Sequence, residues 1–531
     1  MRRSRSRSAP TRSSACCAPS SASRRSPTTR ASRRTPTGSR TGRTSCHCSR
    51  TRSPAPPPRT GRRACSPQAS SRGGCARSPR GSRSPARSAS SPRARSTAPR
   101  ATARPSPRRS ASTGTPAPRP SHPRCSASTT LRCATGSPPH ASDGSTVTTD
   151  LLDIEALLSD EERATRARVR ALVDRDIRPH VAEWFEAARF PTELVPALAA
   201  EGLLGMHLHG HGCAGRSAVE YGIAMQELEA GDSGIRTFVS VQGSLAMSAI
   251  AKHGSDEQRA QWLPRMARGE TIGCFGLTEP NAGSDPGSMQ TVARRDGDDW
   301  ILDGAKRWIG LASIADVAVI WAQTDEGIRG FLVDTASAGF TATPIGQKLS
   351  MRASIQCDIA LDGVRVPERM RLPEARGLRA PFECLNEARF GIAWGALGAA
   401  RDSLEVALAY ASERELFGRS LASMQLTQAR LAEMALELHQ CQLLALHLGR
   451  RKDAGVLEPH QISMGKLASC RAAIRIAREA RGILGGNGVT LERSPMRHAL
   501  NLESVRTYEG TDEVHTLVIG QALTGIPAFR G

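Results

Sequence analysis

The chain has 531 residues and a formal charge of +23, but the excess charge is confined to its first 142 residues. That segment holds 31 Arg and 21 Pro with no Lys, acidic or aromatic residue, whereas the rest holds 42 basic and 50 acidic residues. No apolar run approaches the ~20 residues of a membrane-spanning helix, and the six Cys after residue 142 lack a CxxC pair or a His at metal-ligand spacing. We therefore expect neither a transmembrane helix nor a metal site, and the body of the chain is long enough for two or three domains.

Residues 1–146 have the composition of a disordered extension, rich in Arg, Ser and Pro. Three origins are weighed: a basic arm that binds nucleic acid or an anionic surface, a transit peptide, for which the segment is several times too long, and a G+C-rich gene translated in the wrong frame or from too early a start. The third is favoured because Arg occurs without Lys or acid, with Val147 as a candidate true start. No nucleic-acid partner is therefore expected.

Residues 147–271 are predicted to form a helical domain. Ser159-Asp160-Glu161-Glu162 has the capping-box pattern of a helix start, and further helices are predicted at about 217–230 and 236–253. Residues 272–376 change to short β-branched and aromatic runs between turns, which predicts a small antiparallel sheet domain.

Residues 377–531 are again predicted to be helical. Ala-rich apolar positions recur at i, i+3, i+4 and i+7 over about 382–412, 425–451, 459–484 and 511–523, as in a four-helix bundle. The order α, β, α lacks βαβ alternation, so the chain is predicted to be α+β rather than a doubly wound nucleotide fold.

One carboxylate near the C-terminus is a candidate catalytic base. It lies in Thr507-Tyr508-Glu509-Gly510-Thr511, just before an apolar run. A Glu held at a glycine break in an apolar neighbourhood becomes basic enough to take a proton from carbon. Most Glu-Gly pairs are ordinary solvated turns, so this segment needs support from others.

Three other segments are suited to hold a flat or phosphorylated ligand. The run from Phe275 to Asp285 offers amides and hydroxyls at the helix-to-sheet junction. Trp308-Ile309-Gly310 ends a predicted strand, and Gly485-Gly486-Asn487-Gly488 allows close approach of the backbone. Taken singly, these are equally an ordinary turn, a core Trp and a helix C-cap.

Taken together and in this order, these segments resemble the acyl-CoA dehydrogenase family over about residues 150–530. The strongest likeness is to the branch of the family that acts on glutaryl-CoA. That likeness rests on Gly210-His211-Gly212-Cys213-Ala214-Gly215, Glu227-Leu228-Glu229-Ala230-Gly231-Asp232-Ser233-Gly234-Ile235-Arg236 and Leu385-Asn386-Glu387-Ala388-Arg389-Phe390-Gly391-Ile392-Ala393-Trp394-Gly395. The resemblance implies an N-terminal helical domain, a middle β domain, a C-terminal bundle, non-covalent FAD and electron-transfer flavoprotein as partner. It also implies a homotetramer in which a neighbouring subunit completes each flavin site.

By motif position the resemblance assigns roles to individual residues. Glu509 matches the family's catalytic base, and the base position of one other branch is Ala388 here, which cannot serve. The residues expected at FAD are Phe275, Leu277, Thr278, Gly283, Ser284, Trp308, Ile309, Gly310, Arg414, Phe417, Gln425, Gly482, Gly485, Gly486 and Thr511. The residues expected at the acyl-CoA are Glu229, Arg236, Ser240, Ser284, Leu385, Asn386, Arg389, Tyr508 and Gly510.

Arg236 indicates the substrate class. In the glutaryl branch the matching Arg pairs with the distal carboxylate of the substrate, and an apolar chain would leave a buried Arg236 unpaired, at a cost of several kcal/mol. The resemblance therefore implies oxidative decarboxylation of glutaryl-CoA to crotonyl-CoA and CO2, in lysine and tryptophan breakdown. A dehydrogenase or oxidase for another short-chain or dicarboxylic acyl-CoA stays open as the alternative.

Three departures from the family pattern remove no group that the chemistry requires, and one of them is the run Thr511-Asp512-Glu513-Val514 near the C-terminus. Gly310 stands where the family has Thr, which takes a hydroxyl away from the flavin, and His211 stands where close relatives have Tyr. The expected location is the cytoplasm of a bacterium, or the mitochondrial matrix if the source is a eukaryote.

Overall fold

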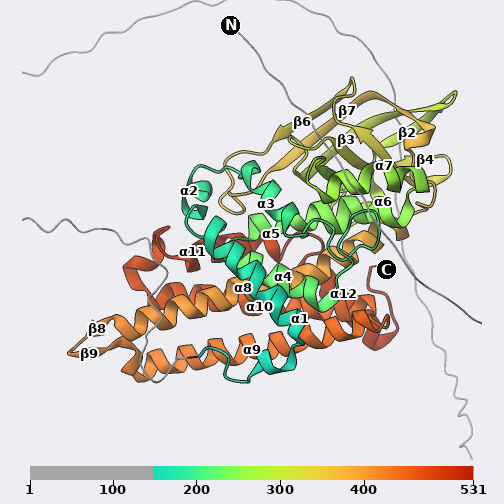
Figure 1. The fold of residues 1–531 in the computed structure, drawn as a ribbon. Coiled ribbons are helices and arrows are strands. Elements are labelled where there is room, and N and C mark those ends of the chain that lie inside the picture. The colour runs from blue at the N-terminus through green and yellow to red at the C-terminus, as the bar shows by residue number, and fades with distance from the viewer. Residues whose placement is uncertain (1–147, 530–531) are drawn as a thin grey trace, which may run out of the picture. The chain divides into compact units, whose positions relative to one another are not determined.

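The structure is a computed structural model, and it describes residues 148–529 of the chain. The extension expected over residues 1–146 and the candidate start at Val147 lie outside the described residues. Figure 1 shows the described elements in chain order as a group of helices, a sheet and a second group of helices. The predicted α+β fold class is confirmed.

The N-terminal helices are built around α4 (Ala218–Gly231), in which every residue is buried. Both α1 (Asp160–Leu172) and α4 begin with a capping box, in which a Ser exchanges hydrogen bonds with a Glu three residues later. The helix predicted at about 236–253 begins slightly earlier than expected. It continues through α5 (Ser233–Ser240), the π-helical stretch η4 (Val241–Met247) and α6 (Ser248–His253). The remaining helices of this group are α2 (Val181–Glu186), α3 (Val195–Ala200) and α7 (Asp256–Ala267).

The sheet follows α7 in the chain. Its strands are β1 (Gly273–Gly276), β2 (Val292–Asp296), β3 (Asp299–Gly310), β4 (Val317–Thr324), β5 (Gly327–Asp334), β6 (Phe340–Pro344) and β7 (Gln356–Pro367). Most pairs are antiparallel, as predicted, with β3 between β2 and β7. The pair β1–β4 is parallel, with Phe275 opposite Val319, because β1 enters the sheet from α7 and reaches β4 through a long connection rather than a hairpin.

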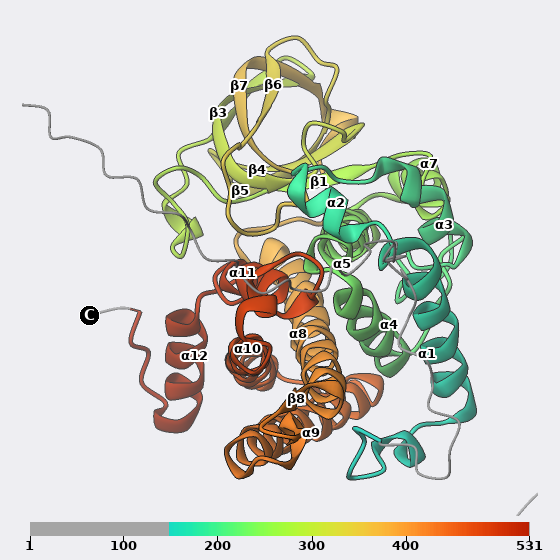
Figure 2. The ribbon, with the colours of Figure 1, turned by 90° about the vertical axis from the view of Figure 1, so that its left-hand side faces the viewer.

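The C-terminal helices form a bundle centred on α10. They are α8 (Arg379–Glu413), α9 (Gln425–Asp453), α10 (Pro459–Ile483), α11 (Ser494–Val505) and α12 (Asp512–Thr524), and the hairpin of β8 (Glu415–Leu416) and β9 (Arg419–Ser420) joins α8 to α9. Helix α10 contacts the four other helices, and Figure 2 shows it among them. Helix α4 also packs along α8, so the two helical groups share a core. None of the helices among the described residues combines the length and hydropathy of a membrane span.

Helix α11 is not among the four helices predicted for residues 377–531. Its buried residues include Arg497, His498 and Asn501, so the apolar repeat that reveals the other helices is missing. Arg497 and Asn501 donate hydrogen bonds to Asp232, which caps the N-terminus of α5. This polar contact positions α5 against the segment that leads to Glu509.

Candidate active site

Glu509 lies in the turn between α11 and α12. Its φ is 54° and that of Gly510 is 109°, so two successive residues adopt the left-handed region. Oε2 of Glu509 is shielded from solvent and has no hydrogen-bond partner within residues 148–529. Burial raises the pKa of this carboxyl above its ordinary value, although the positive charges of Arg236, Lys466 and Arg389 act in the opposite direction. A raised pKa and a free oxygen are properties of a general base.

Three helices hold this turn in place. Arg389 of α8 donates from Nε to the carbonyl of Glu509 at 2.6 Å, and Lys466 of α10 donates from Nζ to the carbonyl of Gly510 at 2.8 Å. A Cβ at position 510 would lie 2.8 Å from Nε2 of His515 on α12. The turn therefore requires glycine at 510, both for its φ and for the space beside His515.

Arg236 lies fully buried on α5 and already has partners. Its Nε donates to Oε2 of Glu229 at 2.6 Å, and its Nη2 donates to the hydroxyl of Tyr508. Burial lowers the pKa of the guanidinium, but Glu229 and Tyr508 raise it by more, so the pKa lies above its ordinary value. Only Nη1 has no partner within the described part of the chain. The expectation that an apolar acyl chain would leave Arg236 unpaired is therefore wrong, because such a chain would leave one N–H group unpaired rather than a whole charge.

Neighbouring helices support the pair of Glu229 and Arg236. The hydroxyl of Ser233 donates to Oε1 of Glu229 at 2.9 Å. A Cβ at Gly395 of α8 would clash with Oε2 of Glu229, so glycine at 395 lets α8 approach the pair closely. Because Tyr508 precedes Glu509, its bond to Arg236 also joins this pair to the turn of the candidate base.

The other residues expected at the acyl-CoA lie on the same helices, with one exception. Ser240 is buried at the end of α5, and its hydroxyl has no hydrogen-bond partner among residues 148–529. Leu385 and Asn386 lie about one turn before Arg389 on α8, and Asn386 accepts a hydrogen bond from Nη1 of Arg389 at 3.3 Å. Ser284 is the exception, because it lies in the exposed loop between β1 and β2.

We call the FAD candidates on β1, on β3 and in the loop after β1 the sheet-side group. It comprises Phe275, Leu277, Thr278, Gly283, Ser284, Trp308, Ile309 and Gly310. The side chains of Phe275, Leu277 and Ile309 are buried in the core, so only their main chains are free to bind a ligand. Trp308 differs, because its φ is 63° and it is 53% exposed. Gly283 has no heavy atom within 4 Å of the place of a Cβ, so the backbone of the loop is open there.

The sheet-side group is next to the candidate substrate helix. A Cβ at Gly310 would lie 3.3 Å from Cγ2 of Val241, the residue that follows Ser240. The structure thus brings the end of β3 close to the end of α5. This proximity is the tertiary link between the predicted cofactor residues and the predicted substrate residues.

A buried ion pair that was not predicted from the sequence anchors the loop between β1 and β2. Nζ of Lys306 donates to Oε1 of Glu279 at 2.8 Å and to the carbonyl of Leu277 at 3.3 Å. Glu279 in turn accepts from the main-chain N–H groups of Gln290 and Thr291, at 2.6 and 3.0 Å. Burial lowers the pKa of Lys306 to about 8, although Glu279 opposes the shift. The only signal in the sequence is a lone Lys in a predicted strand, where buried lysines are rare.

The remaining FAD candidates, apart from Thr511, form a hairpin-side group. It comprises Arg414, Phe417, Gln425, Gly482, Gly485 and Gly486, where α8 ends, α9 begins and α10 ends. Phe417, at the tip of the hairpin, is 97% exposed, and neither Gly485 nor Gly486 has a heavy atom within 4 Å of the place of a Cβ. The hydrogen bond from Asn487 to the hydroxyl of Tyr410, at 3.2 Å, ties the glycine loop to α8.

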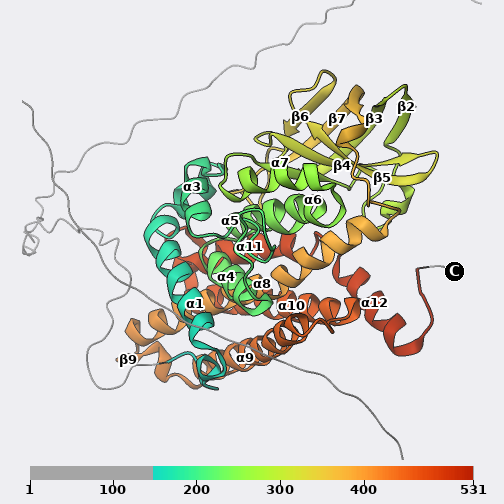
Figure 3. The ribbon, with the colours of Figure 1, turned by 45° about the vertical axis from the view of Figure 1, so that its right-hand side comes forward.

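A single chain does not bring the two groups together. Helix α8 has 35 residues, which makes it about 52 Å long. Figures 1 and 3 place the hairpin at the end of α8 that lies away from the sheet. Thr511 belongs to neither group. It is the N-cap of α12, where its hydroxyl accepts a hydrogen bond from the N–H of Val514 at 3.3 Å.

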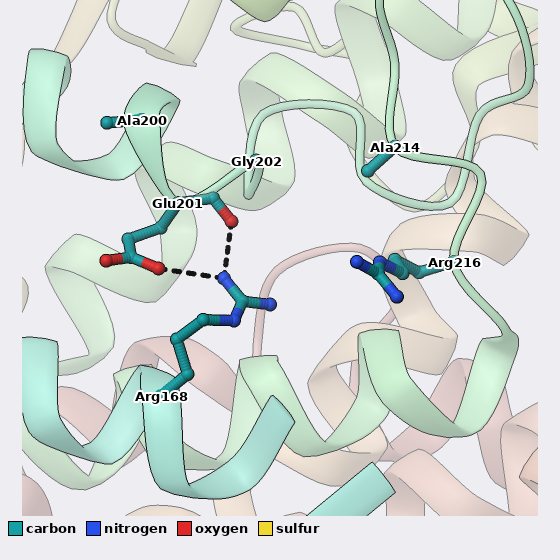
Figure 4. Close-up of a pocket in the computed structure, with 6 residues that line it drawn as sticks. All are labelled: Arg168, Ala200, Glu201, Gly202, Ala214 and Arg216. Carbon is teal, nitrogen blue, oxygen red and sulfur yellow. Dashed lines mark hydrogen bonds and ion pairs between the residues drawn. The ribbon is translucent and has the colours of Figure 1, made fainter. Parts of the chain in front are cut away.

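A pocket lies apart from all of these candidates. Figure 4 shows it between Arg168 of α1 and Arg216, with Glu201, Gly202 and Ala214 along its side. None of the predicted site residues lines it. Arg168 donates to both the carbonyl and the carboxylate of Glu201, at 2.6 and 2.9 Å, so its charge is already compensated.

Family models match the chain in three consecutive parts. The model described as acyl-CoA dehydrogenase, N-terminal domain, matches residues 159–270. The middle-domain model of the same family matches residues 274–364, and the C-terminal-domain model matches residues 375–524.

The chain aligns with nearly the whole length of individual relatives. The short-chain specific acyl-CoA dehydrogenase of Bos taurus mitochondria is 35% identical over 369 residues, which is 68% of this chain and 90% of that protein. A crystal structure of glutaryl-CoA dehydrogenase from Mycobacterium smegmatis is 62% identical, covers 72% of this chain and 99% of its own, and has a TM-score of 0.71. A second structure of a glutaryl-CoA dehydrogenase from that organism, in complex with FADH2, is 59% identical with the same coverage and TM-score.

Proposed function

Because this chain belongs to the acyl-CoA dehydrogenase family, we propose that it oxidises and decarboxylates glutaryl-CoA to crotonyl-CoA and CO2. It is an FAD-dependent acyl-CoA dehydrogenase. One observation carries the choice of substrate: among the buried polar atoms that lack partners within residues 148–529, three belong to the candidate base and to two residues expected at the acyl-CoA. They are Nη1 of Arg236, the hydroxyl of Ser240 and Oε2 of Glu509. An acyl chain with a terminal carboxylate supplies a hydrogen-bond acceptor to Arg236 and Ser240. Its α-carbon supplies the proton that Glu509 takes.

The described residues fit FAD as the cofactor. The exposed ring of Trp308 and the open backbone at Gly283 suit a flat ring system. The open glycines at 485 and 486 suit a pyrophosphate, which backbone N–H groups can approach only where no Cβ intervenes. Bound FAD supplies the acceptor for the hydride that leaves the β-carbon.

Glu509 is proposed to take the α-proton onto Oε2. Its raised pKa brings the carboxylate closer in basicity to the carbon acid. The electron pair left on the α-carbon delocalises into the thioester, whose carbonyl oxygen can accept from the main-chain N–H of Glu509. Among the described residues this N–H donates no main-chain hydrogen bond, so it is free to stabilise the developing negative charge.

Arg236 is proposed to hold the distal carboxylate through Nη1 until it leaves as CO2. The bond from the γ-carbon to the carboxylate then breaks, and its electron pair spreads through the unsaturated thioester. The proton held by Glu509 returns to the γ-carbon and gives crotonyl-CoA. Glu229 and Tyr508 stay bonded to Arg236 throughout, so release of neutral CO2 does not leave a bare buried cation.

The same pairing supports a second candidate, a dehydrogenase for uncharged short-chain acyl-CoA. Since Glu229 already compensates Arg236, a butyryl chain would leave only one N–H group without a partner. The cost of that unmade bond is about 1–3 kcal/mol. This is a preference against such substrates rather than an exclusion.

The test uses the full chain with FAD, glutaryl-CoA labelled at the distal carboxyl, and an artificial electron acceptor. We expect flavin bleaching, release of labelled CO2 and formation of crotonyl-CoA. Bleaching without CO2 would instead indicate a dehydrogenase that does not decarboxylate. If butyryl-CoA bleaches the flavin and glutaryl-CoA does not, the role given to Arg236 is wrong.

Two further proposals concern partners. Electrons are proposed to leave through electron-transfer flavoprotein, as the family resemblance implies. The chain is also proposed to form a homotetramer, in which the hairpin-side group of one copy completes the flavin site of another. The separation of the two groups along α8 supports this proposal.

A further inference from the structure

Lys466 on α10 is a buried cation without an ion-pair partner. It is 1% exposed, and among the described residues no carboxylate oxygen lies within 4.0 Å of its Nζ. The other buried lysine, Lys306, is paired with Glu279, and the half-buried Lys252 and Lys452 share Glu387. Burying a lysine without a counter-charge is costly, so the position calls for a reason beyond packing.

The hydrogen bond of Lys466 points to that reason. Its Nζ donates to the carbonyl of Gly510, at 2.8 Å, and Arg389 donates to the preceding carbonyl, that of Glu509, at 2.6 Å. Successive carbonyls of one strained turn are therefore each fixed by a cation from a different helix. His515 of α12 also lies beside this turn, and its Nδ1 is 3.0 Å from the hydroxyl of Ser463 on α10.

Charged and titratable groups face this turn from each element that packs against it. Arg389 lies on α8, Arg236 on α5, Lys466 and Cys470 on α10, and Asp512 and His515 on α12. Asp512 is engaged by Arg506 and by Arg471. Burial, Lys466 and Arg389 together lower the pKa of His515 to about 3, so this ring is neutral near pH 7. The carboxylate of Glu509 is then the anion left to balance both Lys466 and Arg389.

We propose that Lys466 is a positioning residue for the base: its hydrogen bond to Gly510 holds the turn that aims Glu509, and its charge is the counter-charge of the Glu509 carboxylate. The inference rests on the proposed role of Glu509. It extends that role by naming a group on α10 that, with Arg236 and Arg389, favours the ionised form of the desolvated carboxylate. Glu509 loses its negative charge when it takes the proton, so the stabilisation from Lys466 favours the form that begins the reaction.

Three variants separate charge from packing. Lys466→Met removes the charge and the donor, Lys466→Gln removes the charge but keeps a donor, and Lys466→Arg keeps both. Loss of the positive charge raises the pKa of Glu509, so a higher pH is needed to ionise the base. We expect the acidic limb of the kcat/KM profile to move up by about one pH unit in the Met and Gln variants. In the Arg variant it should stay in place.

A second measurement, independent of turnover, accompanies the pH profile of kcat/KM. Infrared difference titration follows the protonated carboxyl band that disappears in Glu509→Gln, and its midpoint should move with the acidic limb. Lys348→Gln is the matched control, because Lys348 also donates to two main-chain carbonyls, those of Met351 and Ser354. That control should leave both midpoints unchanged.

The outcomes are decisive in both directions. A shift in the Met and Gln variants that the Arg variant abolishes supports the proposal. Folded Met and Gln variants with an unmoved acidic limb overturn it, and so does a failure of both to fold while Lys466→Arg is active. The profiles are recorded with glutaryl-CoA and with butyryl-CoA. If only butyryl-CoA is turned over, the substrate proposal fails, and the test of Lys466 continues with that substrate.

Discussion

At the residue scale, the proposed chemistry depends on a few polar atoms that the fold leaves without partners. Glu509 keeps one carboxylate oxygen free because its turn directs the side chain into a buried space shared with Arg236, Lys466 and Arg389. Arg236 keeps one guanidinium nitrogen free because Glu229 and Tyr508 occupy the others. Unpartnered buried groups are uncommon in folded proteins, and each calls for an explanation.

Glu509→Gln tests the base directly. Removing a general base lowers the rate by about 100- to 10,000-fold, so we expect kcat to fall in that range while acyl-CoA still binds. Stopped-flow bleaching of the flavin measures the chemical step. A loss of less than tenfold would mean that another group takes the proton.

The same variant should change how stability depends on pH. The folded-state pKa of Glu509 is raised above the ordinary value of 4.5, so ionising it in the folded protein costs stability as the pH rises, and that cost is absent below 4.5. Glutamine does not titrate. The free energy of unfolding of the variant, relative to that of the wild type, should therefore rise as the pH rises from 4.5 to the raised pKa of Glu509 and level off above it. Urea unfolding at several pH values measures this difference.

Arg236 must be tested together with Glu229. Arg236→Gln alone strands a buried carboxylate and is expected to destabilise the protein by about 3–5 kcal/mol. The double variant Arg236→Gln/Glu229→Gln removes both charges and should fold. Losing a charged hydrogen bond of about 1.5–3 kcal/mol lowers kcat/KM for glutaryl-CoA by roughly 10- to 100-fold, with little change for butyryl-CoA. Equal losses for both substrates would contradict the role in specificity.

At the element scale, short irregular segments carry the site and long helices hold them. The turn after α11 is fixed from α8, α10 and α12, and the loop after β1 is fixed by Lys306 and Glu279. In each case a cation from a regular element holds main-chain or carboxylate oxygens of the segment. Such anchoring keeps loop residues in the narrow geometry that a reaction requires.

Gly510→Ala should damage the turn more than an ordinary glycine substitution would. A Cβ there would have to fit at a φ of 109° and 2.8 Å from Nε2 of His515. We expect destabilisation of more than about 1 kcal/mol together with loss of turnover. Gly363→Ala is the control, because its φ is 62° and no heavy atom lies within 4 Å of the new Cβ. Similar effects of the two changes would show that the contact with His515 is unimportant.

We expect that breaking the buried ion pair of Lys306 and Glu279 weakens the binding of FAD. Lys306→Met leaves Glu279 buried with only main-chain donors, so we expect destabilisation of about 3–5 kcal/mol and faster loss of FAD on dilution. The double variant Lys306→Met/Glu279→Gln should regain most of the stability. A double variant as unstable as the single one would assign the effect to packing of the lysine stem instead.

At the scale of the whole molecule, the two groups of FAD candidates lie at opposite ends of α8. We therefore expect flavin binding to require assembly. Phe417→Asp alters a side chain that is 97% exposed, so it should leave the melting temperature of the apoprotein unchanged but lower both FAD content and the tetramer fraction in sedimentation. Leu151→Asp, at a residue 67% exposed near the start of the described chain, is the control. A monomer that keeps FAD fully would overturn the shared site.

The sequence by itself indicated the fold class, because apolar repeats and capping boxes are local signals. It indicated the family, and through it FAD dependence, by the resemblance of several short motifs that occur in a fixed order along the chain. It also singled out Glu509, which lies at a glycine break just before an apolar run. Only the tertiary structure decided that Glu229 compensates the charge of Arg236, and that Lys466 and Arg389 hold the turn of Glu509. It also decided that the polar helix at 494–505 joins α5 to that turn. The division of the FAD candidates into two distant groups is likewise visible only in the fold. These features depend on contacts between residues tens to hundreds of positions apart, and a lone buried Lys, Arg or Glu has no local pattern that reveals its partner.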